Sequence, residues 1–499
     1  MKNSKLYLLI LLLLSSLNGI CQELLLTKRQ MLEDFDETIE YINAFAVHKD
    51  LNAVRLGIDY DNEYLNLRNQ ITEETTICEF KSIINKSLRL VQDMHCSFMP
   101  YSYLKKWGKY QKKFNFKDDQ SFEHIKDLED KCGETLGSLL IPIIYENNHY
   151  KVYADFTYKD LRIKKGAKII AYNDGKIEDF ISQDYSRVWP VYINNSLNQQ
   201  YNKWFYHYGD DDFSLTIEDK SSIRTIGFSL KDTVSLKVKP LREVYYGSQK
   251  KEQAIYFKHS KTLYIGMPFM DKKQGQSIIK KIDSLNEAHG DFEKVIVDIR
   301  GNSGGTDVCW RSVLSHLISD KISLHIDLKY KHNPKVLSHY NNGKAVKAER
   351  ISLLDNQIYW TESFKEFTLL PSEKSIRHKG KIYVLQDSFI YSSAGNFSNF
   401  CLHSDQLVSV GATTDLVGGL QTDPLFFKLK HSSLIFRIEP MLDFSGVESV
   451  QDFSHNKVEV EMPMTIEDYH LRTTYPGDLY SKAFLINHDR LVNYVLNDE

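Results

Sequence analysis

The sequence lacks an excess of charge of either sign. Its 499 residues hold 63 lysines and arginines against 66 aspartates and glutamates, which gives a formal net charge of −3. Lysine-rich stretches such as Lys105–Lys113 have acids nearby, as in Lys117–Asp119, and indicate a solvated surface. Proteins that bind nucleic acid or anionic membranes by electrostatics need a strongly basic surface. We therefore expect no nucleic-acid partner.

Metal-binding patterns are also missing. The six cysteines include no CxxC pair and no zinc-site spacing. Histidines such as His403, His431 and His455 show no ligand spacing either. We therefore expect neither a metal site nor a cofactor. An exported chain could still form one or two disulfides, but the sequence cannot pair the cysteines, and a free buried thiol is the default expectation for most of them.

Apolar runs long enough to span a membrane are absent too, because a spanning helix needs about 20 apolar residues. One short apolar run, Leu6–Leu14, follows two lysines and precedes small residues near Cys21. This order is typical of a secretory signal peptide, which we predict over residues 1–21, with export to the periplasm or the extracellular space. A lipid anchor on Cys21 is one alternative, although Ile20 is bulkier than a lipoprotein site normally allows. An N-terminal core helix is the other, although the run is not amphipathic.

Two regions precede the core of the chain. Residues 22–105 show apolar positions at helical spacing, which predicts an N-terminal helical region, and Tyr101–Asp130 looks like a charged connector. Residues 106–245 are predicted to be β-rich. Within them, the stretch from Gly166 to Ile177 resembles the strand–turn–strand of PDZ domains. That resemblance implies binding of an extended peptide by strand addition; the alternative is a β-rich spacer without a ligand.

Residues 246–499 alternate strands with helices, which predicts an α/β core with a largely parallel sheet. In such sheets, ligands bind at the carboxyl ends of the strands. The predicted elements are strands at Thr262–Met267, Lys294–Ile299, Lys381–Leu385 and Leu407–Gly411, helices at Gln276–Leu285, Asp307–Ile318 and Ala394–Leu402, a hairpin at Leu425–Leu429 and Leu434–Ile438, and a closing helix from Asp478 onward.

Two of these strands run into segments that can carry chemistry. The first segment, Asp298–Gly305, has two adjacent glycines that let backbone N–H groups face outward. A helix follows, so its N-terminal dipole points to the same place. Asp298 and Arg300 can fix this turn by hydrogen bonding. An ordinary strand–turn–helix is the alternative, and phosphate binding is not indicated because neither GxxxxGK(S/T) nor GxGxxG occurs.

The second segment, Tyr391–Phe397, places Ser392 and Ser393 between a strand and a helix. A serine at that position is commonly a helix N-cap. Combined with the glycine turn, however, a serine hydroxyl supplies the second part of an acyl-transfer site, namely a nucleophile beside an oxyanion hole.

Together the two segments resemble peptidase family S41, the C-terminal processing and tricorn-type serine peptidases. The family's DLRxNxGG turn is similar to Asp298–Gly305, and its nucleophile segment is similar to Val384–Gly395. The family has a VGxxT sequence about 19 residues after its serine. Gly411 lies 19 residues after Ser392, which favours Ser392 over Ser393. The resemblance implies an α/β fold with a ClpP/crotonase-like core, an N-terminal helical region and a PDZ-like β-rich domain.

The resemblance also bears on the general base. Processing peptidases of the family use a lysine about 25 residues after the serine, where this chain has Val417. Tricorn-like members use a histidine in a segment like LxDxHT, which Leu90–Ser97 resembles with Cys96 in place of the threonine. Imidazole titrates near neutral pH and suits this role. The resemblance thus implies His95 as base; a structural histidine at a helix end, or Cys96 as nucleophile, are the alternatives.

Two further roles follow from the family. An acid downstream of the serine should orient the base. None of the candidates lies in a clear motif: Glu448, Asp452 and Glu459. The oxyanion donors are expected to be the N–H of Gly304 or Gly305 together with that of Ser393.

The sequence thus predicts an exported serine endopeptidase that forms an acyl-enzyme on Ser392, with a polypeptide substrate. Gly395 replaces the acid that usually follows the nucleophile, and Ser303 replaces a common glycine, which indicates a divergent member. A non-catalytic S41-like protein that binds peptides or other ligands is the alternative. Acyl chemistry on the crotonase-like core is a third interpretation, although nothing in the sequence suggests a CoA site.

Overall fold

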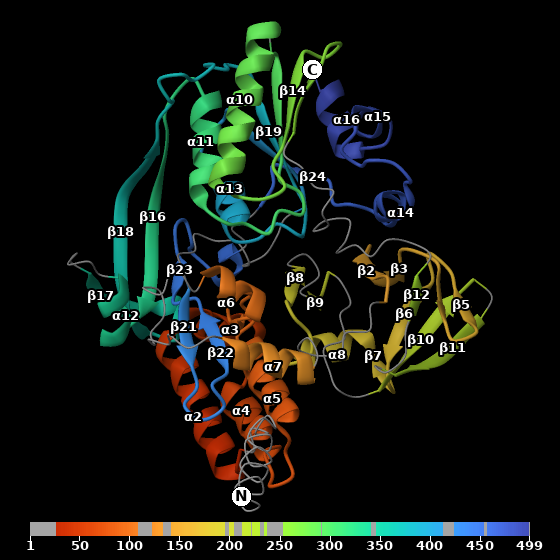
Figure 1. Cartoon of the computed structure of the whole chain (residues 1–499), viewed down its shortest axis with the longest axis vertical. Coiled ribbons are helices and arrows are strands. Elements are labelled where there is room, and N and C mark those ends of the chain that lie inside the picture. Colours follow the sequence, from red (N-terminus) through yellow and green to blue (C-terminus); the bar gives the residue numbers. More distant parts are fainter. Residues whose placement is uncertain are drawn as a thin grey trace, which may run out of the picture.

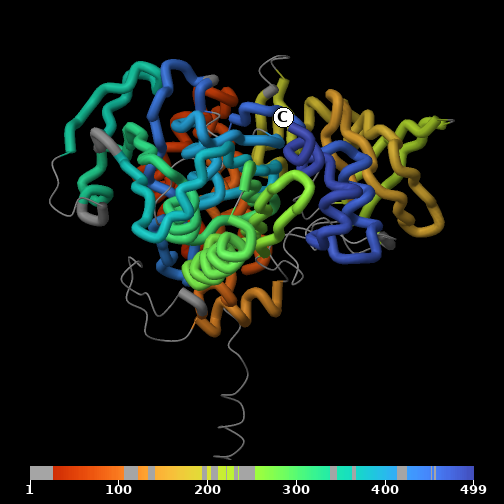
Figure 2. Tube along the Cα trace, turned by 90° about the horizontal axis from the view of Figure 1, so that it is seen from above, coloured from red at the N-terminus to blue at the C-terminus, as the bar shows by residue number. Residues whose placement is uncertain are grey.

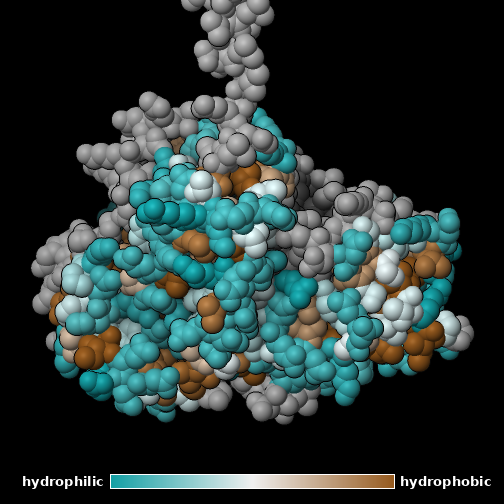
Figure 3. Space-filling model, turned by 90° about the horizontal axis from the view of Figure 1, so that it is seen from below, coloured by the Kyte–Doolittle hydropathy of each residue, from teal (hydrophilic) through white to brown (hydrophobic). Residues whose placement is uncertain are grey.

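The computed structural model describes residues 26–107, 122–132, 141–194, 199–203, 212–220, 222–229, 234–236, 253–290, 292–340, 346–412, 424–453 and 457–498. The predicted signal peptide with Cys21, and Val417, lie outside these residues. Within this part of the chain, no helix combines the length and apolar character that crossing a membrane requires. Seen from below, polar residues predominate on the surface, and apolar residues form small separate groups (Figure 3).

Helices build the N-terminal region, at the lower end of Figure 1. They are α2 (Lys28–Phe45), α3 (Val47–Leu56), α4 (Tyr60–Asn69), α5 (Ile77–Leu90), α6 (Tyr101–Trp107) and α7 (Glu123–Cys132). Threonine capping boxes start α2 and α5. The interpretation of Tyr101–Asp130 as a connector was wrong for α6 and most of α7. Its charged residues hid two helices, and a Cys78–Cys132 disulfide ties α7 to α5.

The β-rich region contains a sheet in the order β11-β10-β6-β3-β2, with β7 beside β6, a second sheet β12-β4-β5, and a ribbon β8-β9. Its elements are β2 (Ile143–Glu146), β3 (His149–Val152), β4 (Phe156–Tyr158), β5 (Leu161–Ile163), β6 (Lys168–Tyr172), β7 (Gly175–Lys176), α8 (Ile177–Gln183), β8 (Tyr192–Asn194), β9 (Gln199–Tyr201), β10 (Phe213–Asp219), β11 (Ser222–Phe228) and β12 (Val234–Leu236). The predicted turn at Asn173 joins β6 to β7 with a positive φ of 48°. Peptide binding by this region stays a prediction.

The predicted α/β core is confirmed. Its sheet has the order β13-β14-β15-β19-β20-β24, and every pair except β13–β14 is parallel. The strands are β13 (Gln253–Phe257), β14 (Thr262–Gly266), β15 (Lys294–Asp298), β19 (Ile382–Gln386), β20 (Leu407–Gly411) and β24 (Val460–Glu461).

Both faces of this sheet are covered, which explains why its strands read as continuous apolar runs. One face, with Val295 and Val297, packs with α10 (Lys272–Ala288), α11 (Asp307–Leu317) and α13 (Ser393–Cys401). The opposite face, with Ile296, packs against α15 (Lys482–Asn487) and α16 (Arg490–Asn497). These two helices stand where a single closing helix was predicted from Asp478 onward. A further helix, α14 (Ile466–Thr474), precedes that segment and lies beside the β-rich region (Figure 2).

A second sheet, β17-β18-β16-β23, forms the long arm at the left of Figure 1 and was not predicted. It consists of β16 (Ile322–Lys331), β17 (Lys347–Ile351), β18 (Gln357–Leu369) and β23 (Met441–Asp443), with α12 (Pro334–Tyr340), η2 (Ser352–Leu354) and η3 (Val450–Phe453) nearby in the chain. Lys331 in β16 and Tyr359 in β18 both donate to Asp50 of α3, which attaches the arm to the helical region.

The predicted hairpin, β21 (Leu425–Lys428) and β22 (Ile435–Ile438), leaves the core and packs into the helical region. There β22 pairs with β1 (Ser97–Phe98), which follows α5 and His95. Phe427 of β21 lies with its ring centroid 4.4 Å from that of Tyr41 and 5.0 Å from that of Phe45, both on α2. The hairpin therefore brings a late part of the chain next to the His95 segment.

Candidate active site

Ser392 has an unusual backbone conformation. It stands between β19 and α13 with φ 55° and ψ −123°, a region that residues with a side chain rarely adopt. Although it occupies the N-cap position of α13, its side chain makes no capping hydrogen bond. The helix-cap interpretation therefore fails for this serine. A strained strand-to-helix turn that presents a hydroxyl is instead typical of hydrolase nucleophiles.

Ser393 differs from its neighbour in its surroundings. Its side chain is buried, and its hydroxyl donates to Asp307 Oδ1 at 2.7 Å, whereas Ser392 is partly exposed. Asn396 donates to the same carboxylate, so Asp307 ties the start of α11 to the start of α13. Of the two hydroxyls, that of Ser392 is the better placed to attack a substrate.

The glycine turn lies directly against Ser392. A Cβ atom on Gly304 would stand 2.6 Å from the Tyr391 carbonyl oxygen and 2.7 Å from the Ser392 Cβ, so no side chain fits there. The Tyr391 N–H also donates to the Asn302 carbonyl at 3.0 Å. The two segments that sequence analysis paired therefore meet in the structure.

The candidate oxyanion donors differ in availability. The Gly304 N–H donates to Asn302 Oδ1 at 2.8 Å, which occupies it. Gly305 is exposed, and Ser393 is the first residue of α13. Among the described residues, neither the Gly305 nor the Ser393 N–H has a hydrogen-bond acceptor. Of the predicted donors, the N–H groups of Gly305 and Ser393 are therefore the ones that can bind an oxyanion.

His95 faces a carboxylate that sequence analysis did not select. In the antiparallel pair β1–β22, Ser97 is opposite Arg437. Continuing this register by two residues brings His95 opposite Glu439, and His95 Nδ1 lies 3.3 Å from Glu439 Oε2. Both side chains are buried. The His95 ring also lies 4.7 Å from the ring of Tyr391, the residue before Ser392.

The surroundings of His95 favour its neutral form. Burial lowers its pKa well below the ordinary value of 6.5, and the charges of Arg437 and His48 act in the same direction. Asp93 Oδ1 accepts a hydrogen bond from the His95 N–H at 3.0 Å, and its other oxygen lies 3.7 Å from His48 Nδ1. A neutral imidazole can accept a proton, as a general base must.

The three acids proposed from the sequence form hydrogen bonds with residues other than His95. Asp452 accepts hydrogen bonds from Ser449, and Glu448 donates its N–H to Asp452. Glu459 accepts from the Ser409 N–H at 3.0 Å. No interaction found in the described part of the chain joins any of them to His95. The one available signal for Glu439 was a glutamate directly after the apolar strand Leu434–Ile438.

Cys96 is a poor nucleophile here, because burial raises the pKa of its thiol well above the usual value. No three histidine, cysteine, aspartate or glutamate side chains gather as a metal site would require, at least in the residues that the structure describes.

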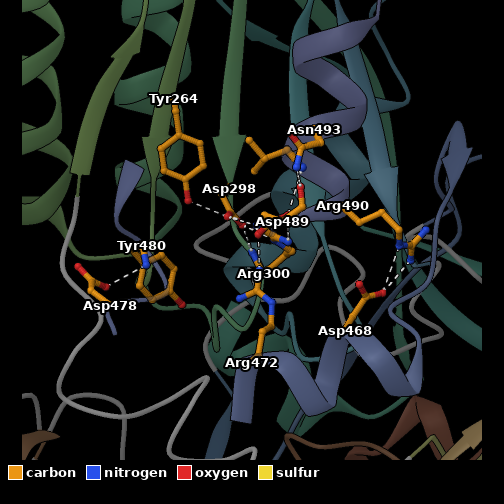
Figure 4. Close-up of polar contacts among 11 residues, drawn as sticks. Tyr264, Asp298, Arg300, Asp468, Arg472, Asp478, Tyr480, Asp489, Arg490 and Asn493 are labelled. Atoms are coloured by element: carbon orange, nitrogen blue, oxygen red, sulfur yellow. Dashed lines mark hydrogen bonds and ion pairs between the residues drawn. The ribbon is translucent and has the colours of Figure 1, made fainter. Parts of the chain in front are cut away.

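The start of the glycine turn is anchored by Arg300, whose side chain is 3% exposed. Its N–H and Nε donate to Asp298 Oδ1 at 3.1 and 2.9 Å, and its Nη2 donates to Asp298 Oδ2 at 2.6 Å (Figure 4). Tyr264 donates to the same Oδ2 at 2.8 Å. The next residue, Gly301, donates its N–H to Asp387 at 2.9 Å. The predicted fixing of the turn by Asp298 and Arg300 is therefore present.

Comparison with solved structures gives a similar fold. A structure of mature CPAF complexed with lactacystin has a TM-score of 0.53 at 12% identity, covering 89% of this chain and 96% of that chain. Another structure of mature CPAF has a TM-score of 0.53 at 11% identity, covering 89% and 94%. No curated protein matches the chain. The model of peptidase family S41 matches residues 261–451, which hold both the glycine turn and Ser392. Over this core, the chain is similar to peptidase family S41.

Proposed function

We propose that this protein is an exported serine endopeptidase in which Ser392 is the nucleophile, His95 the general base and Glu439 the acid that orients the base. One observation carries the proposal: the strained Ser392 lies against the glycine turn, while His95, close to Tyr391, faces the buried Glu439. These are the groups that an acyl-transfer site needs.

The reaction follows from these positions. His95 accepts the proton of the Ser392 hydroxyl as its oxygen attacks the peptide carbonyl. The carbonyl oxygen becomes an oxyanion that accepts hydrogen bonds from the N–H groups of Gly305 and Ser393, each typically worth about 3 kcal/mol in the transition state. His95 then protonates the leaving amine, and the C–N bond breaks. Water, deprotonated by His95, attacks the ester and releases Ser392.

Glu439 acts only through His95. Its carboxylate beside Nδ1 stabilises the imidazolium that forms during attack and leaves Nε2 as the ring nitrogen that accepts the serine proton. Because burial and Arg437 disfavour the charged imidazole, a carboxylate at this place offsets part of that cost in the transition state.

Export is supported by two independent features. The leader-like residues 1–21 predict secretion. The Cys78–Cys132 disulfide fits an oxidising compartment, since structural disulfides are rare in reducing cytosol.

Hydrolysis of an unfolded protein such as casein tests the proposal. We expect the wild-type protein to cleave it and Ser392→Ala to lose at least about 10³-fold of the rate. Gly304→Ala should lose about 10²-fold or more, because a methyl group would push Ser392 and the turn apart. Glu439→Gln should lose about 10²-fold or more, whereas the exposed Glu448→Gln is the matched control and should keep its rate.

The outcomes separate the alternatives. Full activity of Glu439→Gln together with loss in Glu459→Gln or Asp452→Asn would move the acid to one of those residues. A folded wild-type protein that binds unfolded chains without cleaving them would instead identify a non-catalytic S41-like binding protein.

A further inference from the structure

A buried ion network connects the glycine turn to the C-terminal helices. The guanidinium of Arg300 meets Asp489 as well as Asp298: Nη1 donates to Asp489 Oδ1 at 3.0 Å, and Nη2 donates to Asp489 Oδ2 at 2.8 Å. Figure 4 shows Arg300 between the two carboxylates, with Arg472 reaching Asp489 from α14. Residues almost 200 positions apart therefore share one contact.

Asp489 has a second role in the same place. It is the N-cap of α16, and its Oδ1 accepts the N–H of Val492 at 3.2 Å. A single carboxylate thus starts α16, pairs with Arg472 of α14 and holds Arg300 of the turn. Any shift of α14 and α16 relative to the sheet would be transmitted to Arg300 through two parallel hydrogen bonds, a geometry that resists rotation as well as stretching.

Burial makes this arrangement sensitive to the loss of one member. The side chains of Arg300, Asp298 and Asp489 are 3%, 3% and 1% exposed, and that of Arg472 is 6% exposed. These four groups carry two positive and two negative charges. Burial raises the pKa of Asp489, but the two arginines outweigh that effect and hold it at about 2. Loss of its charge would leave buried arginines undercompensated.

We infer that Asp489 is a positioning residue for the oxyanion turn, so that the C-terminal helices set the place of the Gly305 N–H. This inference rests on the proposed peptidase function. Four residues separate Arg300 from Gly305, and the path between them is fixed by Asp387 at Gly301 and by Met267, which accepts from Asn302 Nδ2 at 2.7 Å. The far end of the turn is held by the Thr306 N–H, which donates to Met270 at 2.7 Å. Arg300 is the residue of the turn that is held by Asp489, and the other contacts involve neither Asp489 nor the C-terminal helices.

Positioning of this kind affects the transition state more than substrate binding. An oxyanion exists only during attack and deacylation, so a displaced donor lowers kcat with little change in KM. A displacement of about 1 Å can cost about 10²-fold in rate.

The chain offers a matched control beside this network. Asp468 of α14 pairs with Arg490 of α16 at 3.0 Å and closes the capping box of α14. It joins the same two helices, and Figure 4 shows no hydrogen bond or ion pair between Asp468 and Arg300. Asp468→Asn therefore weakens the C-terminal helices without touching the turn.

The test compares Asp489→Asn with Asp468→Asn, well below both melting temperatures, by casein cleavage and by hydrogen exchange at Gly301 and Gly304. We expect Asp489→Asn to lose about tenfold or more in kcat, with KM within about twofold, and to exchange faster at both turn amides. Asp468→Asn should keep the wild-type kcat and turn protection. Equal kcat and exchange in the two variants would overturn the inference.

A second variant covers the case in which Asp489→Asn does not fold. The double variant Asp489→Asn with Arg472→Met keeps one arginine against one carboxylate, so no buried charge is left over. It should show the same loss of kcat and of turn protection, and wild-type values in it would contradict the inference. If the wild-type protein cleaves nothing, the proposed function fails, while hydrogen exchange still decides whether Asp489 holds the turn.

Discussion

At the scale of single residues, two adjacent serines are distinguished by what their hydroxyls contact. Ser393 is buried and donates to Asp307, while Ser392 stands partly exposed on a strained backbone. The energy stored at such a position is of the order of 1–3 kcal/mol and persists only where the surroundings enforce it. The contact of Gly304 with Ser392 is one such constraint.

His95 gives a prediction for the pH dependence of the reaction. Its pKa lies well below 6.5 because of burial first, then the charges of Arg437 and His48. The base is active when neutral, that is above its pKa, so kcat/KM should fall on the acid side with a midpoint below pH 6.5. Arg437→Gln should move this midpoint upward, since it removes a positive charge that opposes protonation. A pH–rate profile of both proteins measures the two midpoints.

Arg437 also donates to Ser97 and to the Met94 carbonyl, so its loss can lower the maximal rate for structural reasons. The test therefore compares the pH midpoints of the two profiles and not their maximal rates. Arg350→Gln, on an exposed arginine of β17, is the control and should leave the midpoint in place. A wild-type midpoint above pH 6.5, or a downward shift in Arg437→Gln, would contradict the assignment of His95.

The parts of the candidate site that lie in local motifs could be proposed from the sequence. The glycine turn, Ser392 and His95 each belong to a short segment whose spacing is visible in one dimension. Glu439 does not, because its place opposite His95 depends on the register between β1 and β22, which are more than 300 residues apart. The hydrogen bond from the Gly304 N–H to Asn302 Oδ1 could not be predicted either, because it depends on the conformation of the folded turn.

At the scale of elements, α7 holds the hairpin that carries Glu439. His124 of α7 contacts the Ser433 carbonyl at 3.1 Å, and Ile125 packs with Phe426 and Ile435. The Cys78–Cys132 disulfide secures α7 to α5 on its other side. These cysteines cannot be paired from the sequence, because their pairing depends on how two helices pack.

Removal of this disulfide should lower stability. Cys78→Ser with Cys132→Ser releases a loop of about 54 residues, and we expect the free energy of unfolding to fall by about 2–5 kcal/mol, with a lower Tm. Reductant should lower the Tm of the wild type but not of the variant. In denaturant without reductant, the chain lacking residues 1–21 should titrate as three thiols, those of Cys96, Cys309 and Cys401. Five reactive thiols would show that the bridge is absent.

At the scale of the whole molecule, the candidate site lies where distant parts of the chain meet. The core supplies Ser392 and the turn, and the helical region supplies His95. The hairpin β21–β22, which lies against the helical region in Figure 1, brings Glu439 beside His95. The β-rich region adjoins the C-terminal helices instead: Lys165 pairs with Glu467 at 2.6 Å, and the Ile466 N–H donates to Glu146 at 2.7 Å.

The α/β core was predictable at this scale because alternating strands and helices leave a strong local pattern. The arm β16–β18 was not predicted, although β16 (Ile322–Lys331) alternates apolar and polar residues as a half-buried strand does. Its pairing with β18 (Gln357–Leu369) depends on long-range register, which the sequence does not show.

The central claim is that Ser392 is a nucleophile activated by this assembly. Its most direct test is labelling of the protein and its variants with a fluorophosphonate probe, followed by tandem mass spectrometry of the peptide that spans residues 391–397. We predict an adduct on Ser392 in the wild type and in Ser393→Ala, and none in Ser392→Ala. An adduct on Ser393, labelling that survives in Ser392→Ala, or no labelling of the folded wild-type protein would contradict the account.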